Sequence, residues 1–338
     1  MDALPLIGAP GSPYTRKMVA LLRYRRLPYR YIYRGREPAD WPRPKVQLLP
    51  TFILKDVEGA LQAVTDSTPL IRRFEREYEG RSVRPPSAAL AFLDALLEDY
   101  ADEWLTKAMF HYRWAYRQDI DHAAGVLPSC GPAPLGDEAL AAMGKVFSER
   151  QIGRLRYVGS NAVTGPVIEE SYVRFVDLME THLKQHRFLL GDRPGAGDFG
   201  VFGQLTQLAH MDPTPSTLTE KRAPRVYAWV WTTDDLGGIE IADDGWFDPA
   251  ALPETLLAIL AETGRVYAPL LLANAAAVAS GADSVETTID GKPWSQQSFA
   301  YQAKCLGWLR EEYAALGAGD RALVDGALAE TAWAGVFG

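Results

Sequence analysis

The order of secondary-structure signals in the first 80 residues restricts the fold of this chain more than any other feature. Short apolar segments predict strands at 4–9, 28–33, 48–54 and 60–65, and amphipathic segments predict helices at 15–26 and 70–78. A polar linker with two prolines covers 81–87, and the pattern beyond it is almost wholly helical. The sequence therefore predicts an α/β domain over residues 1–82 followed by an all-α domain over residues 88–338.

The loop between the first strand and the first helix contains Ser12, followed directly by Pro13. Serine is a favoured helix N-cap, and proline is favoured as the first helical residue. The N-terminus of a helix carries partial positive charge and attracts anions, a thiolate included. The simplest interpretation of Ser12 alone is that it only caps its helix.

Composition excludes several classes of protein. The 338-residue chain has a formal net charge of -8, which argues against nucleic-acid binding through a basic surface. Its two cysteines are too few for a disulfide framework or a thiolate zinc site. We find no signal peptide, and the longest apolar stretch, 267–279, is too short to span a bilayer. We therefore expect a cytoplasmic protein without a membrane or nucleic-acid partner.

Two further motifs follow in order. Leu49-Pro50 opens the third predicted strand, and Asp66-Ser67 opens the helix after the predicted hairpin. With the Ser12-Pro13-Tyr14 loop, these motifs resemble the glutathione transferases, which combine a thioredoxin-like N-terminal domain with an all-helical C-terminal domain. The resemblance covers residues 4–80 and extends more loosely to residue 232.

Two later segments qualify this resemblance. Residues 190–205 look like the helix-capping segment of the family, with Gly195 in place of the usual Ser or Thr and Asp198 placed to bind backbone amides. Residues 253–338 have no counterpart in typical members and form an extension.

The resemblance implies a site for glutathione, the expected co-substrate. In that site Ser12 donates a hydrogen bond to the sulfur and does not itself attack. Leu49 precedes a cis bond to Pro50 and pairs through its backbone with the cysteinyl part of the ligand. Ser67 and nearby amides hold the γ-glutamyl carboxylate, and Asp66 faces the ammonium group, although its side chain is shorter than that of the usual Glu or Gln.

A second, small hydrophobic substrate should bind between the two domains. The candidates for its pocket are aromatic: Tyr14, Phe110, Tyr112 and Trp114. The alternative for each is packing in the core or at a dimer contact.

The sequence thus favours a homodimeric glutathione transferase that conjugates, reduces or isomerises a small electrophile. The alternative is a non-catalytic binding or scaffold protein of the same fold, whose C-terminal extension contacts a partner. No metal is expected, because the one i, i+4 histidine pair, His182 and His186, has no acidic or cysteine partner placed to complete a site.

Overall fold

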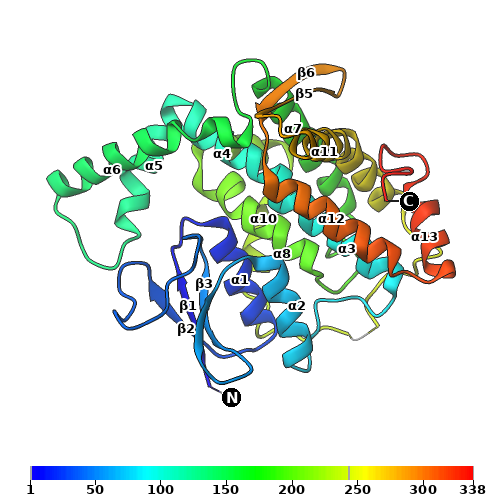
Figure 1. Cartoon of the computed structure of the whole chain (residues 1–338), viewed down its shortest axis with the longest axis horizontal. Coiled ribbons are helices and arrows are strands. Elements are labelled where there is room, and N and C mark those ends of the chain that lie inside the picture. The colour runs from blue at the N-terminus through cyan, green and yellow to red at the C-terminus, as the bar shows by residue number, and fades with distance from the viewer. Residues whose placement is uncertain (1, 243, 338) are drawn as a thin grey trace.

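The computed structural model describes residues 2–242 and 244–337 (Figure 1). Its N-terminal part is a four-stranded sheet in the order β2-β1-β3-β4. Strands β1 and β2 are parallel, whereas β3 runs antiparallel to both β1 and β4. The elements of this part are β1 (Leu4–Gly8), α1 (Pro13–Tyr24), β2 (Tyr29–Tyr33), β3 (Thr51–Lys55), β4 (Leu61–Val64) and α2 (Ser67–Glu77).

Strand register brings three separate loops to one end of this sheet. Ile7, near the end of β1, is opposite Thr51, the first residue of β3. Phe52, the next residue of β3, is opposite Val64 at the end of β4. The loop after β1, the residues before β3 and the start of α2 therefore lie at the same edge.

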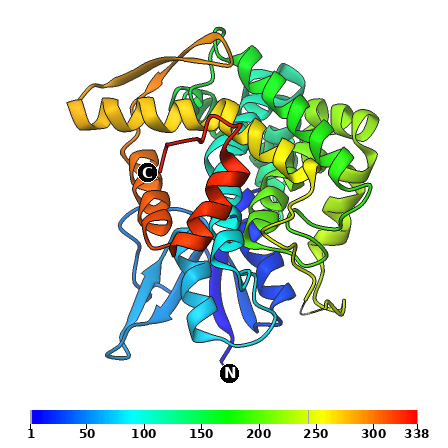
Figure 2. The ribbon, with the colours of Figure 1, turned by 90° about the vertical axis from the view of Figure 1, so that its right-hand side faces the viewer.

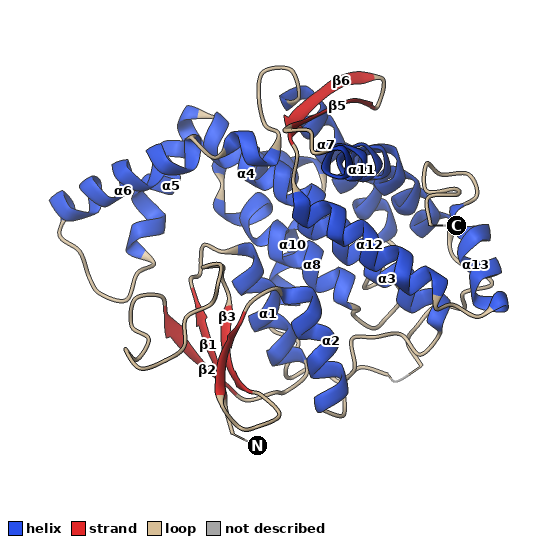
Figure 3. Ribbon diagram, viewed as in Figure 1, coloured by secondary structure: helices blue, strands red, loops and turns tan. Residues whose placement is uncertain are grey.

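The C-terminal part is built from helices, with one hairpin among them (Figure 3). The sequence predicts a long helix or a broken pair over 88–114, and this part of the structure has a helical stretch from Ala88 to Ala115 made of α3, a π-helical segment and α4. Its elements up to residue 234 are α3 (Ala88–Tyr100), η1 (Ala101–Leu105), α4 (Thr106–Ala115), α5 (Arg117–Ser129), α6 (Asp137–Ile152), η2 (Leu155–Val158), α7 (Gly165–His182), α8 (Ala196–Leu205), η3 (Thr206–Met211), α9 (Pro213–Arg222) and α10 (Pro224–Asp234).

The capping segment before α8 has the predicted geometry. Gly195 is the N-cap, and Asp198 is fully buried. Its carboxylate accepts hydrogen bonds from the Leu189 and Gly195 backbone amides, each at 2.9 Å. Such bonds supply partners for amides that would otherwise be buried and unsatisfied. The role of Asp198 as a folding residue is thereby confirmed.

The C-terminal extension contains α11 (Glu254–Ser280), β5 (Ser284–Ile289), β6 (Lys292–Gln297), α12 (Ala300–Ala314) and α13 (Ala318–Leu328). The sequence pattern predicts two helices, at 253–263 and 266–280, but the structure has one continuous helix, α11. Gly264 lies between the two predicted segments. A Cβ atom there would lie 2.9 Å from the Trp333 ring, so this glycine permits close packing and does not end a helix.

Helix α11 also corrects the expectation that no segment could span a membrane. By length and composition alone, this one helix among the described residues is long and apolar enough to cross a bilayer. However, 61% of its most apolar window is buried inside the protein, as in a core helix. It packs against α3, α7, α12 and α13.

Residues 285–289 followed by Asp290-Gly291 predict a short hairpin, and the structure confirms it as β5 and β6. The label all-α for this domain is therefore too simple. Asp290 and Gly291 form the turn with φ of 51° and 73°, the left-handed values that a two-residue turn of this kind requires. Trp294 on β6 is buried against Trp104, with ring centroids 5.3 Å apart. The hairpin is thus attached to the helical core.

The last two helices pack back onto the earlier part of the chain. Figure 2 shows α12 and α13, in orange and red, beside the cyan α3 and close to α2. Arg72 on α2 forms an ion pair with Glu312 on α12. The extension is therefore an integral part of the fold, and it lies next to the end of the sheet domain that carries the predicted site.

Candidate active site

Ser12 lies at the N-terminus of α1 and caps it. Its Oγ atom accepts a hydrogen bond from the Thr15 backbone amide at 3.3 Å, and Pro13 is the first helical residue. Among the described residues, no hydrogen bond uses the Ser12 hydroxyl hydrogen. The side chain is half-buried. A hydroxyl in this position keeps its hydrogen available for an anion bound at the helix end, where the partial positive charge of α1 is greatest.

The peptide bond between Leu49 and Pro50 is cis, as the resemblance implies. Pro50 is buried and Leu49 is half-buried. Both lie at the edge of the sheet that also carries the loop after β1. Thr51 follows, and its hydroxyl donates to the Leu48 carbonyl oxygen at 2.8 Å. The backbone of Leu49 thus lies at the same end of the sheet as Ser12. Its pairing with a ligand stays a prediction.

Asp66 precedes α2 with φ of 82°. Its side chain does not cap the helix. Instead, its Oδ2 atom accepts a hydrogen bond from the hydroxyl of Tyr301 at 2.9 Å. Burial raises the pKa of Asp66, and this hydrogen bond opposes that effect. Sequence reasoning missed Tyr301, because no local signal connects residues 235 positions apart.

The hydroxyl of Ser67 is buried and already hydrogen-bonded. It accepts a bond from Lys17 Nζ at 3.0 Å and donates to Asp102 Oδ2 at 3.3 Å. A bound carboxylate would need the one hydrogen of this hydroxyl, so that hydrogen would have to turn away from Asp102. The N-terminus of α2 offers partial positive charge to such a ligand group.

Lys17 is the centre of a buried ionic cluster beneath this site. Its Nζ atom lies 2.7 Å from Glu98 Oε1 and 2.6 Å from Asp102 Oδ2, and its side chain is 1% exposed. Burial tends to lower the pKa of this ammonium group, but the two carboxylates raise it overall. Burial raises the pKa of Asp102 to about 6, against the opposing charge of Lys17. Sequence reasoning missed this cluster, because a lysine beside an apolar helix stripe is usually solvated.

The four aromatic candidates for the second substrate have different surroundings. Tyr112 and Trp114 are buried in the core, each about 2% exposed. Phe110 is half-buried and packs against Trp114. The half-buried Tyr14 donates its hydroxyl hydrogen to the Asp102 carbonyl oxygen at 2.7 Å and so connects α1 to the helical domain. The prediction that they bind a substrate is untested, but only Tyr14 and Phe110 keep partly exposed surface.

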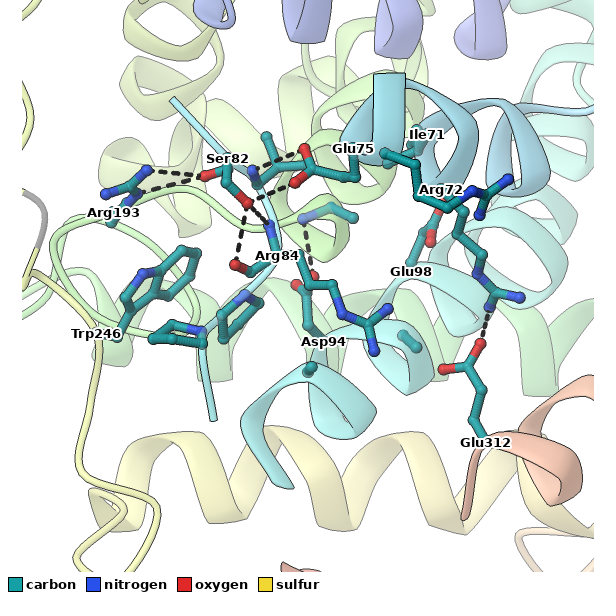
Figure 4. A pocket seen from close by; sticks show the side chains of 17 residues that line it. Ile71, Arg72, Glu75, Ser82, Arg84, Asp94, Glu98, Arg193, Trp246 and Glu312 are labelled. Atoms are coloured by element: carbon teal, nitrogen blue, oxygen red, sulfur yellow. Dashed lines mark hydrogen bonds and ion pairs between the residues drawn. The ribbon is translucent and has the colours of Figure 1, made fainter. Parts of the chain in front are cut away.

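Two cavities open near the predicted site without including it. The first has a volume of about 770 Å³ and lies between α2, the linker, α3 and α12. Figure 4 shows its charged lining, in which Arg72 pairs with Glu312 while Arg84 lies near Asp94. The second, about 240 Å³, lies between the domains. Ser12 lines neither cavity, although its neighbour Gly11 lines the second one.

A second buried cluster contains Glu103, Asp99 and Lys107. Burial raises the pKa of Glu103 to about 8 and that of Asp99 to about 7. Burial also lowers the pKa of Lys107 to about 8, although the charge of Glu103 opposes this effect. Folding therefore requires these carboxyl groups to hold protons that the unfolded chain has already lost at neutral pH.

The stability of the protein should depend on the protonation of Glu103. A glutamate is protonated in the unfolded chain only below a pH of about 4.3. Because its folded pKa is higher, the contribution of Glu103 to stability should be greatest below that pH and should fall as the pH rises towards 8. In Glu103→Gln this part of the loss should disappear. The variant should then gain at least about 1 kcal/mol relative to the wild type between pH 5 and pH 8.

Urea unfolding followed by tryptophan fluorescence at four pH values measures this effect. Glu58→Gln, at an exposed turn position, serves as the control and should follow the wild type. Parallel curves for Glu103→Gln and the wild type would show that Glu103 does not titrate in this range.

Of the histidine pair, His182 is the last residue of α7 and His186 lies beyond its end. His182 is fully buried, with its ring nitrogens hydrogen-bonded to Thr255 Oγ1 and to the Phe188 carbonyl oxygen. Burial lowers its pKa to about 4. Within residues 2–242 and 244–337, no group of three or more His, Cys, Asp or Glu side chains could hold a metal ion.

Comparison with known proteins gives two family matches. A model described as the glutathione S-transferase N-terminal domain matches residues 6–82, and one described as the glutathione S-transferase C-terminal domain matches residues 137–230. Together they span more than half of the chain. No curated protein matches the sequence.

Solved structures give more distant similarities. A GST-like protein from Pseudomonas syringae is 17% identical, with 75% of this chain and 82% of that chain covered and a TM-score of 0.42. A glutathione S-transferase from Methylobacterium radiotolerans, in complex with glutathione sulfonate, is 16% identical, with 73% and 100% covered and a TM-score of 0.41. A glutathione S-transferase from Rhodospirillum rubrum F11 is 16% identical, with 72% and 96% covered and a TM-score of 0.40.

The two matched domains follow each other in the order of the observed α/β and helical parts of the structure. The chain belongs to the glutathione S-transferase family.

Proposed function

We propose that this protein binds glutathione at the edge of the sheet formed by Ser12, Leu49-Pro50 and Asp66-Ser67, and that it activates the glutathione thiol. The observation that carries the proposal is the hydroxyl of Ser12. It lies at the N-terminus of α1 with a hydrogen that no described residue accepts, on the same sheet edge as a cis-proline and the N-terminus of α2. Membership of the family supports glutathione as the ligand.

The chemistry needed is stabilisation of a thiolate. A free thiol has a pKa of about 8.5, so it is mostly protonated at neutral pH. A hydrogen bond from Ser12 to the sulfur, together with the helix end, favours the thiolate and releases the proton to solvent. The thiolate then forms a carbon–sulfur bond with a small electrophile, from which a leaving group departs. The cavity at Gly11 and Arg16 is the proposed place for that second substrate, because it lies between the domains beside Ser12.

Binding of glutathione is the first test. Titration calorimetry with up to 10 mM glutathione should give a saturable signal, since millimolar affinity corresponds to about 4 kcal/mol of binding free energy. S-methylglutathione, which cannot form a thiolate, should bind without the proton release seen with glutathione. Absence of binding of both ligands would overturn the proposal.

Turnover is tested with 1-chloro-2,4-dinitrobenzene, whose chloride is displaced by the thiolate. The homodimeric state and the cytoplasmic location expected from the sequence remain proposals, as does the hydrophobic nature of the second substrate.

A further inference from the structure

The C-terminal extension reaches the predicted ligand site through the first turn of α12. Tyr301 donates its hydroxyl hydrogen to Asp66 Oδ2 at 2.9 Å. Tyr301 also packs edge-on against Trp308, which lies two turns further along the same helix. The contact therefore involves a side chain whose ring is held in place by its own helix.

The start of α12 is fixed by a buried side chain of α11. Asn274, fully buried, accepts a hydrogen bond from the Phe299 backbone amide at 2.8 Å and donates to the Phe299 carbonyl oxygen at 2.9 Å. Gln302, in the first turn of α12, accepts a hydrogen bond from Gln296 Nε2 at 3.3 Å. Tyr301 lies between these two anchored residues, so its position relative to α2 is set by the extension.

A second connection holds α12 along α2. Glu312 forms the ion pair with Arg72, and both side chains are less than one-third exposed. The extension is thus attached to α2 at its start, through Asp66, and in its second turn, through Arg72. Movement of α12 away from the site would break both contacts.

The charges around Asp66 explain what the tyrosine does. Burial favours the neutral carboxyl group and raises its pKa. The hydrogen bond from Tyr301 opposes this effect most strongly, followed by the positive charges of Lys17 on α1 and Lys304 on α12. Lys17 is already paired with Glu98 and Asp102. Without the hydroxyl of Tyr301, the pKa of Asp66 would be raised further.

We propose that the C-terminal extension forms part of the glutathione site, with Tyr301 as a positioning residue that holds the carboxylate of Asp66 for the ammonium group of the ligand. This inference rests on the proposed function. A carboxylate has room for several hydrogen bonds, so the bond from Tyr301 leaves Asp66 able to accept another from an ammonium group. The site consequently selects ligands with a free α-amino group, and the extension decides how well it does so.

A matched pair of variants tests the inference. Tyr301→Phe removes one hydroxyl and keeps the ring. Tyr313→Phe, on the same helix, removes a hydroxyl that donates to Asp325 at 2.6 Å, within the extension. Titration calorimetry should show about threefold to tenfold weaker glutathione binding for Tyr301→Phe at pH 7, as for the loss of a typical hydrogen bond. Tyr313→Phe should bind like the wild type.

The pH profile distinguishes positioning from general loosening of the fold. The loss of affinity on acidification should begin at a higher pH in Tyr301→Phe than in the wild type, because Asp66 becomes protonated earlier. In the Asp66→Asn background, Tyr301→Phe should have no further effect on affinity, since the carboxylate is already absent. N-acetylated glutathione lacks the ammonium group. Its affinity should therefore change little, and by a similar amount, in Tyr301→Phe and in Asp66→Asn.

Different experimental results would overturn the proposed function and the proposed role of the extension. A wild-type protein that binds no glutathione overturns both. If the wild type binds glutathione and Tyr301→Phe has the same affinity and pH profile, the role of the extension is overturned while the proposed function stands. Additive effects of Asp66→Asn and Tyr301→Phe on glutathione affinity would also overturn the role of the extension.

Discussion

Replacement of Lys17 by methionine is expected to destabilise the protein by about 3–5 kcal/mol, the usual cost of leaving buried carboxylates without their partner. Lys17 contacts both Glu98 and Asp102, all three are buried, and no other described cation lies within ion-pair distance of these two carboxylates. The midpoint of urea unfolding at pH 7 measures the loss. This loss of stability should be smaller below pH 5, where the carboxyl groups take up protons.

Two comparisons make this result specific. Arg117→Ala removes an exposed i, i+4 ion pair with Asp121 and should change stability by less than about 0.5 kcal/mol. Adding Asp102→Asn to Lys17→Met should restore part of the lost stability, because one buried charge is removed with its partner. A Lys17→Met protein as stable as the wild type would mean that water reaches the cluster.

Replacement of Ser12 by alanine is expected to lower the rate of glutathione conjugation by about tenfold to a hundredfold, the range for losing a hydrogen bond to a charged group. The pKa of the bound thiol should rise, because the only change is the loss of a donor to the sulfur. A pH series of the rate with 1-chloro-2,4-dinitrobenzene reports that pKa. Glutathione affinity should change much less than the rate.

Ser87 provides the matched control. It is the N-cap of α3, and its Oγ atom accepts a hydrogen bond from the Leu90 amide at 3.4 Å, much as Ser12 does from Thr15. Both alanine variants should lose about 1 kcal/mol of stability, the typical value of an N-cap. Only Ser12→Ala should shift the pH profile. If both variants shift the pH profile, or if neither does, Ser12 acts as a helix cap alone.

The positions of Tyr14 and Lys17 connect these two predictions. Both lie on α1, directly after Ser12, and both contact the segment that contains Asp102. The helix that presents the proposed thiol-binding hydroxyl is therefore fixed to the helical domain by a hydrogen bond and by a buried ion pair. A change in this contact would alter the orientation of Ser12 as well as stability.

Several parts of the site could be predicted from the sequence because they depend on near neighbours. Ser12-Pro13 defines a helix start wherever it occurs, and Asp290-Gly291 defines a tight turn. Asp198 lies three residues after its cap and bonds the amide at that position. In each case the interacting groups are a few residues apart, so the chemistry of the segment is sufficient.

The burial of the aromatic candidates could not be predicted from near neighbours in the sequence. Phe110 and Trp114 are four residues apart on α4 and share one face of the helix, whereas Tyr112 between them lies on the opposite face. Their spacing alone does not show which direction leads to the core. Only the packing of the neighbouring helices places Tyr112 and Trp114 inside.

The sequence by itself determined the order of elements in the first 80 residues, the helix cap at Ser12 and the turn of the hairpin. The cis bond before Pro50 was expected from the family resemblance. Only the tertiary structure decided that Lys17 is buried with Glu98 and Asp102, and that Tyr301 meets Asp66. The physical reason is that local backbone preferences are properties of a few adjacent residues, whereas burial and long-range hydrogen bonds depend on which helix the fold places opposite a side chain.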